Sequence, residues 1–190
     1  MDIVEQIKNY VPYNELEEKD KQLILKCIET YPDIFNRENP VAHMTASAWV
    51  TNKTRTKILM AYHNIYKSFS WLGGHCDGNK DCLEIAIKEV KEESGIQNVK
   101  AISDDILSLE VLTVDGHYKH GEYVSSHLHL NVTYLLEADD SEELIIKEDE
   151  NSAVKWFDVD KAIEASNEEW FKENIYSKLN KKMEDLIWKQ

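Results

Sequence analysis

The sequence predicts a mixed α/β domain with helices at both ends of the chain. Short runs rich in strand-forming residues lie between about 43 and 157, and one strongly capped helix interrupts them at roughly 81 to 93. Helical periodicity of apolar residues marks both ends of the chain. With 42% hydrophobic and 31% charged residues, and only six glycines and three prolines in 190 residues, the composition excludes collagen-like, low-complexity and disordered classes.

Residues 2 to 35 predict a short helix followed by a longer one. Asn14 stands as an N-cap before apolar residues that recur at helical spacing, and Pro32 ends the pattern. We therefore expect an N-terminal helical extension over 1–38 and a core domain over 39–165.

The core domain is expected to begin with an antiparallel pair of strands, at about 43–50 and 58–62, joined by a polar turn. Asp115-Gly116 predicts a further turn. Later strand-like runs occupy about 98–102, 107–114, 125–136 and 153–157.

The last segment, 166–190, predicts a C-terminal helix that packs on the domain or in a homodimer interface. Ser166 to Glu169 has the pattern of a capping box. An apolar stripe at helical spacing follows, made by Trp170, Phe171, Ile175, Leu179, Met183 and Leu186.

The charge balance and the cysteines limit the partners and the location. Twenty-two Lys and Arg against thirty-six Asp and Glu give a net charge of −14, which repels nucleic acid. The N-terminus lacks the pattern of a signal peptide, and no apolar run approaches the ~18 residues of a membrane span. Three cysteines without C-x-x-C spacing indicate reduced thiols. We expect a soluble, cytoplasmic protein that binds neither nucleic acid nor membrane.

The helix at 81–93 carries the strongest chemical signal. Glu89, Glu92 and Glu93 are spaced i, i+3 and i+4, so their carboxylates project from one side of the helix. Crowding of like charges destabilises a bare helix and suggests a bound divalent cation, with Mg²⁺ the natural oxygen-preferring one. The alternative is a solvated charged face.

The segment from Gly74 to Ile96 resembles the Nudix box, G-x5-E-x7-R-E-U-x-E-E-x-G-U, where U is aliphatic. Seven of the nine specified positions agree: Gly74, Glu89, Val90, Glu92, Glu93, Gly95 and Ile96. Trp71-Leu72-Gly73-Gly74-His75 looks like the family's approach to the box, although its proline is absent. The resemblance extends over roughly 40 to 165.

Two lysines depart from this pattern. Lys80 stands where the box has Glu, and Lys88 stands where it has Arg. Glu84, four residues before Lys88, is expected to pair with it, and Asp81 is expected to cap the helix. Because the ligands themselves are kept, we expect catalysis to survive. The alternative is a Nudix-fold nucleotide-binding or sensor module without catalysis.

The resemblance implies a Nudix-type α/β/α sandwich with a mixed β-sheet, and an enzyme that hydrolyses a nucleoside diphosphate linked to another moiety. It implies Mg²⁺, with Mn²⁺ as an alternative, bound by Glu89, Glu92 and Glu93. Glu92 and Glu93 would act in catalysis, and the Gly73 and Gly74 backbone would complete the substrate site. Glu148, Asp149 and Glu150 are candidates for the general base, with Glu150 chosen among them.

Histidines on the run at 125–136 give a second set of candidates. His127 and His129 share a polar side with Asn131 and Thr133, while Leu128, Leu130, Val132 and Tyr134 form an apolar side. The polar side lines the substrate cleft, where His127 or His129 contacts phosphate or metal, or it meets solvent. His117 and His120 are expected in a surface loop, and His63 and His75 receive no role.

Overall fold

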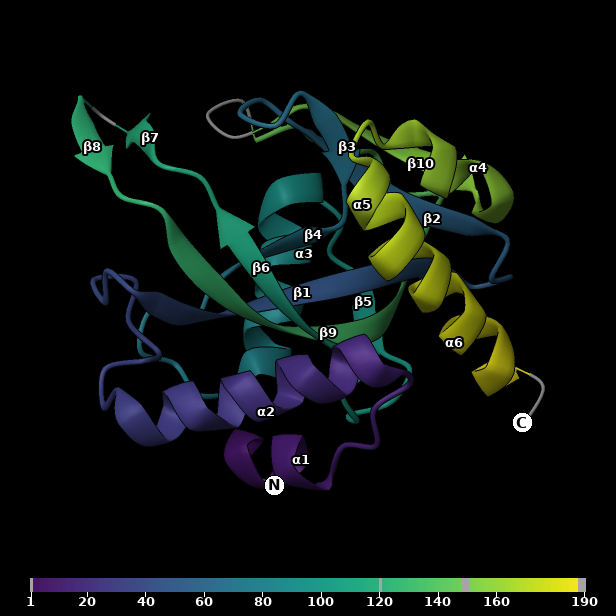
Figure 1. The fold of residues 1–190 in the computed structure, drawn as a ribbon. Coiled ribbons are helices and arrows are strands. Elements are labelled where there is room, and N and C mark those ends of the chain that lie inside the picture. The colour runs from purple at the N-terminus through teal and green to yellow at the C-terminus, as the bar shows by residue number, and fades with distance from the viewer. Residues whose placement is uncertain (1, 120, 148–150, 188–190) are drawn as a thin grey trace.

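The computed structural model describes residues 2–119, 121–147 and 151–187 (Figure 1). A mixed sheet lies between two helical layers, so the predicted α/β/α sandwich is confirmed. Among the described residues, no helix is long and apolar enough to span a membrane.

The N-terminal helices are α1 (Ile3–Asn9) and α2 (Glu15–Thr30), as predicted. The Asn14 side chain caps α2 by accepting a hydrogen bond of 2.9 Å from the Glu17 N–H. The helix ends at Thr30, just before Pro32.

The sheet is built around β1 (Ala42–Asn52), whose eleven residues are all buried. β1 pairs in parallel with β9 (His127–Ala138) over eleven residue pairs, from Ala42 opposite Leu128 to Asn52 opposite Ala138. The remaining pairs are antiparallel. The other strands are β2 (Lys57–His63), β3 (Ser68–Ser70), β4 (Leu72–His75), β5 (Val99–Ala101), β6 (Ser108–Val114) and β10 (Asn151–Asp158).

A two-stranded hairpin stands apart from this sheet. It consists of β7 (His117–Lys119) and β8 (Glu122–Val124). The prediction of a loop at His117 is therefore wrong, because the chain after Asp115-Gly116 is paired with the segment before β9. His120 lies outside the described residues.

Helices cover each face of the sheet with a separate apolar core. On one face, α1, α2 and α3 (Cys82–Ser94) pack against alternate residues of β1 and β9. The other face is covered by α4 (Val159–Ala165), α5 (Glu169–Phe171), a π-helical turn over Lys172–Tyr176 and α6 (Ser177–Ile187).

The middle of the predicted C-terminal stripe is buried against the sheet, and its two ends are exposed. Ile175, Leu179 and Met183 are buried in the core that contains Trp49. Trp170 and Leu186 are exposed, because they lie beyond the part of the helical segment that covers the sheet.

Two carboxylates of α2 cover the free edge of β6. Glu17 accepts a hydrogen bond from the Leu109 N–H, and Asp20 accepts one of 3.1 Å from the Val111 N–H. An uncovered edge strand would present these N–H groups to other chains. The N-terminal extension therefore closes the sheet on this side.

Glu17 also belongs to a buried ion cluster that joins α2 to α6. Its Oε1 lies 3.1 Å from Lys178 Nζ and 2.8 Å from Lys182 Nζ. Lys178 also pairs with Glu110 of β6 at 3.1 Å, and both glutamates are fully buried. Burial raises the pKa of Glu17, but attraction from the two lysines outweighs burial, and the pKa falls to about 2.

We predict that Glu17→Gln lowers the free energy of unfolding by about 3 to 5 kcal/mol at pH 7, because it removes the carboxylate shared by the buried ammonium groups of Lys178 and Lys182. The depressed pKa means that Glu17 stabilises the fold above about pH 5, and that this contribution is lost as the pH falls toward 2. Urea unfolding at pH 7 and at pH 3 should therefore show a smaller pH dependence in the variant. Glu15→Gln, exposed in the first turn of the same helix, is the control and should change stability little; equal effects of the two substitutions would contradict the prediction.

Candidate functional site

The helix α3 is fixed at both ends by the predicted caps. The Asp81 carboxylate accepts a hydrogen bond of 2.9 Å from the Glu84 N–H. At the other end Gly95 has φ of +78°, a conformation that favours glycine, and its N–H bonds the Lys91 carbonyl at 3.0 Å. Ala86 and Val90 are fully buried. The carboxylates of α3 are therefore carried on a rigid element.

Strand β4 brings a glycine against this helix. Gly74 pairs with Ala46 of β1 and faces Glu89, and a Cβ atom at Gly74 would lie only 2.5 Å from Glu89 Cδ. Any side chain here would displace the carboxylate. Gly74 thus lets the backbone of β4 lie directly against Glu89.

Glu93 is the best anchored of the three carboxylates. It is only 5% exposed and accepts hydrogen bonds from the Gly73 N–H at 2.9 Å and from Asn151 Nδ2 at 3.1 Å. Sequence reasoning missed Asn151, although it directly follows the acidic run in which a general base was sought. Its buried Oδ1 has no hydrogen-bond partner among the described residues, so an unpaired amide oxygen lies beside Glu93.

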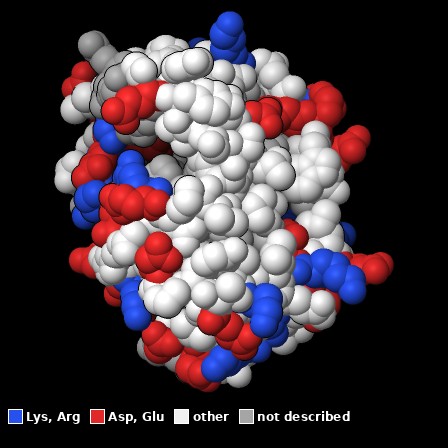
Figure 2. All heavy atoms as spheres, turned by 60° about the vertical axis from the view of Figure 1, so that its left-hand side comes forward, with Lys and Arg blue, Asp and Glu red and all other residues white. Residues whose placement is uncertain are grey.

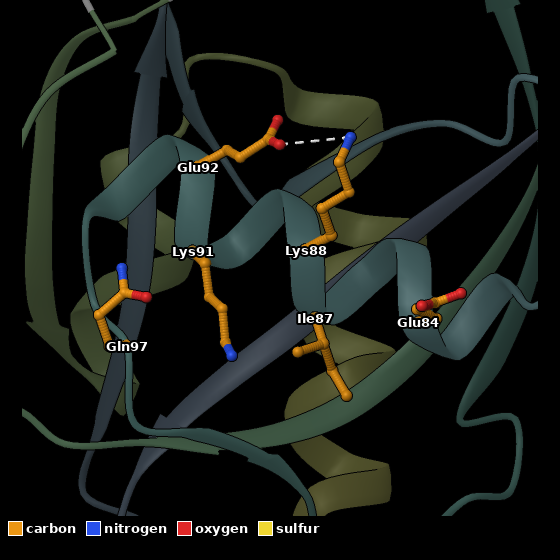
Figure 3. Close-up of a pocket in the computed structure, with 6 residues that line it drawn as sticks. All are labelled: Glu84, Ile87, Lys88, Lys91, Glu92 and Gln97. Atoms are coloured by element: carbon orange, nitrogen blue, oxygen red, sulfur yellow. Dashed lines mark ion pairs between the residues drawn. The ribbon is translucent and has the colours of Figure 1, made fainter.

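Glu92 lies on the exposed flank of α3 and pairs with Lys88. The ammonium is 3.3 Å from Glu92 Oε1 (Figure 3) and 3.8 Å from Glu89 Oε1. Lys147 lies 3.9 Å from Glu92 Oε2. Glu92 and Lys88 line a surface hollow on α3 together with Glu84, Ile87, Lys91 and Gln97.

The expected partnership of Glu84 with Lys88 is wrong. Glu84 accepts a hydrogen bond of 2.9 Å from Asn79 Nδ2, and among the described residues Lys88 forms its ion pairs with Glu89 and Glu92. The more crowded carboxylates attract the ammonium more strongly than a single neighbour that already has an amide partner. Lys80 lies over the ring of Phe35, 5.6 Å from its centre.

The three glutamates share one side of the helix only in part. Glu89 and Glu93 face β4, and the Glu89 side chain is 12% exposed, whereas that of Glu92 is 42% exposed. Carboxylates with an unpaired amide oxygen suit a hard divalent cation. These side chains supply oxygen donors of that kind, and Lys88 places positive charge next to Glu89 and Glu92.

The polar side of β9 is mostly a buried network and not an open surface. Asn131 Oδ1 accepts hydrogen bonds from Thr45 at 3.0 Å and Ser47 at 2.8 Å, and its Nδ2 donates to Glu110. Thr133 also donates to Glu110, at 2.9 Å. We expected the polar side of β9 to line the substrate cleft or to meet solvent. For Asn131 and Thr133 both expectations are wrong, because β1, β6 and α6 enclose these side chains. The apolar side of β9 is confirmed as core.

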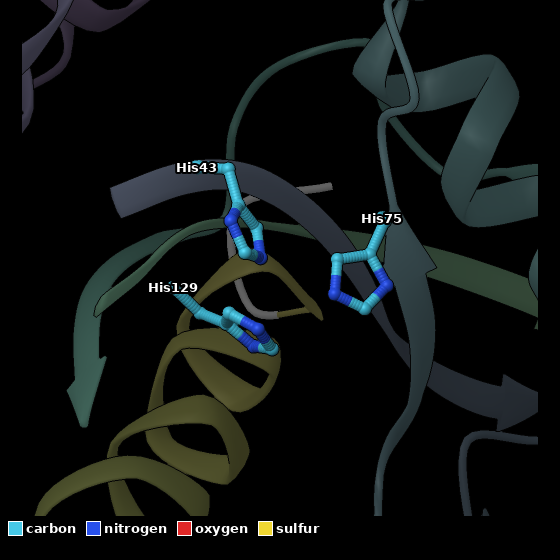
Figure 4. A group of neighbouring side chains, drawn as sticks. All are labelled: His43, His75 and His129. Carbon is cyan, nitrogen blue, oxygen red and sulfur yellow. The ribbon is translucent and has the colours of Figure 1, made fainter. Parts of the chain in front are cut away.

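His127 and His129 lie at the start of β9, half-buried, and two further histidines join them. His43 of β1 pairs in register with His129, and His75 ends β4 (Figure 4). Burial first, and then the neighbouring imidazoles, lower the pKa of His129 to about 2. Burial also lowers the pKa of His43, although the hydrogen bond to the Asn39 carbonyl raises it in part. Sequence reasoning could not find this group, because only the sheet register brings the strands together.

The candidates for the general base, Glu148, Asp149 and Glu150, lie outside the described residues.

The three cysteines, Cys27, Cys76 and Cys82, are free and buried. On the face shown in Figure 2, acidic and basic side chains lie in small groups around a largely uncharged central strip.

Several solved structures share this fold. An Ap4A hydrolase from C. elegans, in a binary complex, is 17% identical with a TM-score of 0.56, and the match covers 77% of this chain and 98% of that one. A NUDIX family hydrolase from Clostridium perfringens is 24% identical with a TM-score of 0.52, covering 76% and 97%. A dihydroneopterin triphosphate pyrophosphohydrolase from E. coli is 15% identical with a TM-score of 0.50, covering 70% and 92%.

A comparison with curated proteins gives no match. The family model of the NUDIX domain, in contrast, matches residues 41–179, which is well over half of the chain. This match supports the predicted enzyme class, a Nudix hydrolase acting on acid anhydrides. On this match and the shared fold, the chain belongs to the NUDIX domain family.

Proposed function

We propose that this protein hydrolyses a pyrophosphate bond in a nucleoside diphosphate linked to another moiety, with Mg²⁺, or Mn²⁺ in its place, held by Glu89, Glu92 and Glu93. The observation that carries the proposal is the contact of a capped, acidic helix with the glycine pair of β4. Two similar structures are named as an Ap4A hydrolase and a dihydroneopterin triphosphate pyrophosphohydrolase, and both names agree with hydrolysis of a phosphate anhydride.

Each carboxylate has a distinct part in this proposal. Glu93 ties α3 to β4 through the Gly73 N–H and orients the site, while the exposed Glu92 is open to substrate and solvent. Glu89 lies against Gly74, where the backbone of β4 can approach a phosphate closely. A bound divalent ion supplies charge neutralisation on the pyrophosphate oxygens and lowers the pKa of coordinated water.

The general base and the outer substrate contacts are part of the same proposal. Glu150 is our choice for the base, since it directly precedes Asn151, which donates a hydrogen bond to Glu93. His127 and His129 are proposed to contact substrate where β9 begins. A small nucleotide or related diphosphate as substrate, cytoplasmic location and homodimer formation stay predictions.

The rival function is a nucleotide-binding or sensor module without catalysis. One observation favours it: Lys88 already places a positive charge between Glu89 and Glu92, where a catalytic cation would bind. An assay of phosphate or nucleoside monophosphate release with Mg²⁺, on a panel of nucleoside di- and triphosphates, sugar nucleotides and dinucleotide polyphosphates, separates the two. Binding without release would favour the module.

We predict that Glu92→Gln and Glu93→Gln each lower turnover at least tenfold, because the loss of a carboxylate charge weakens metal binding and charge neutralisation in the transition state. Initial rates at saturating substrate and limiting Mg²⁺ measure the effect. Glu84→Gln is the matched control, since Glu84 lies on the same helix and bonds only Asn79 among the described residues. Unchanged rates in both site variants would contradict the assignment.

We also predict that Mg²⁺ raises the melting temperature of the substrate-free protein, because a ligand of the folded state stabilises it. A thermal-shift titration to millimolar Mg²⁺ measures this, and Glu92→Gln should reduce the shift. A flat titration of the unmodified protein would favour a solvated acidic face without a metal.

Lys88→Gln should lower the Mg²⁺ concentration needed for half-maximal rate by a few-fold, because it removes a positive charge 3.3 Å from Glu92. Without Mg²⁺ the same variant should melt at a lower temperature, since the glutamates then repel one another uncompensated. Lys91→Gln, which changes a lysine in the same surface hollow, is the control. If the two variants behave alike, Lys88 does not compete with the metal.

A further inference from the structure

Four imidazoles meet where β1, β4 and β9 come together. The ring centres of His43, His75 and His129 lie 4.9 to 5.0 Å apart (Figure 4), and that of His127 lies 4.8 Å from His43. The three rings in Figure 4 face a common space. One ring nitrogen from each of these three lies within 4.8 Å of the others.

Hydrogen bonds to backbone carbonyls orient two of the four rings. His43 Nδ1 is 3.2 Å from the Asn39 carbonyl, so it carries the proton and leaves the lone pair on Nε2. His43 is only 3% exposed, and this buried Nε2 has no hydrogen-bond partner among the described residues. His127 Nδ1 likewise lies 2.8 Å from the Ser125 carbonyl. A backbone carbonyl behind the ring is a common way to orient a histidine ligand, and His43 and His127 each have one.

One distance already suits a shared ion. His127 Nε2 lies 3.3 Å from His129 Nε2. Two nitrogens bound to one tetrahedral zinc at roughly 2.0 to 2.1 Å lie about 3.3 Å apart. The same separation suits an N–H···N hydrogen bond between the two rings, and this is the metal-free alternative.

The chemistry of the group favours a metal ion over a phosphate, so metal binding and the substrate contact proposed above are alternative roles for His127 and His129. The group gathers the ring nitrogens of three imidazoles at one point, where they can offer lone pairs. Neutral imidazole suits first-row transition ions, whereas Mg²⁺ prefers oxygen.

We propose that His43, His75 and His129 bind a transition-metal ion, Zn²⁺ by preference, with His127 as the neighbour that can complete a tetrahedral set. Gly74 faces Glu89 of α3, and the adjacent His75 points to the opposite face of the sheet, because side chains alternate along a strand. This second site is therefore distinct from the carboxylate site, and it does not rest on the proposed hydrolysis.

The experiment uses the full chain without a histidine tag, stripped of metal by a chelator and kept in millimolar Mg²⁺ so that the carboxylates are occupied. Co²⁺ is the spectroscopic probe, and Zn²⁺ is added in competition. We expect one Co²⁺ per chain with visible absorption typical of nitrogen ligands in tetrahedral geometry, displaced by one Zn²⁺. Glu92→Gln should leave this signal unchanged.

The variants His75→Gln and His129→Gln should each weaken Co²⁺ binding at least tenfold. His117→Gln, which changes a histidine of β7 outside the group, is the matched control and should bind as the unmodified protein does. Circular dichroism and melting without metal show whether each variant is folded. Should one of them fail to fold, the other and His127→Gln provide the same comparison.

Three results would overturn the proposal. The first is no Co²⁺ absorption in the folded, unmodified protein. The second is equal affinity in folded histidine variants. The third is a signal that disappears in Glu92→Gln, which would place the ion at the carboxylates. If Co²⁺ does not bind and pyrophosphate binds at the histidines instead, the first result would assign these residues to the substrate site.

Discussion

The parallel pairing of β1 with β9 is the constraint on which the remaining structure depends. Eleven consecutive residue pairs fix the register, and a shift by one residue would exchange the two faces of both strands. In the observed register, the alanines and aliphatic residues of one face meet α3, while the polar residues of the other face meet one another. The same register places His43 beside His129.

Strand β4 links the register of β1 to the candidate functional site. Because it pairs with β1, Gly73 and Gly74 lie under α3, where a hydrogen bond from the backbone reaches Glu93. The acidic helix alone would suffer from the repulsion of its carboxylates, and the structure offsets that repulsion locally. Glu93 is bonded to β4 and β10, and Lys88 lies between the other two carboxylates. The lysine that departs from the family pattern thus takes up charge that a metal ion would otherwise neutralise.

The sequence predicted the parts of the structure that local rules determine. The helix α3, its Asp81 cap and its Gly95 end follow from the spacing of neighbouring residues, and so does the buried side of β9. Features that depend on contacts between distant segments could not be predicted in this way. The histidine group depends on three strands that are separated in the chain. The buried partners of Asn131 depend in the same way on β1 and β6. The pairing of Lys88 is local, but it was missed because Asn79 already bonds the Glu84 carboxylate.

Alternation along β4 keeps two kinds of ligand apart. Consecutive residues of a strand point to opposite faces, so Gly74 leaves room for carboxylate oxygens while His75 contributes nitrogen on the other side. Oxygen ligands select hard ions such as Mg²⁺, and imidazole selects softer ones. Two adjacent residues can therefore serve two ions without competition between them. An ion bound by His43, His75 and His129 would also link β1, β4 and β9, the strands that position the acidic helix, so its binding would stabilise the scaffold of the proposed hydrolytic site.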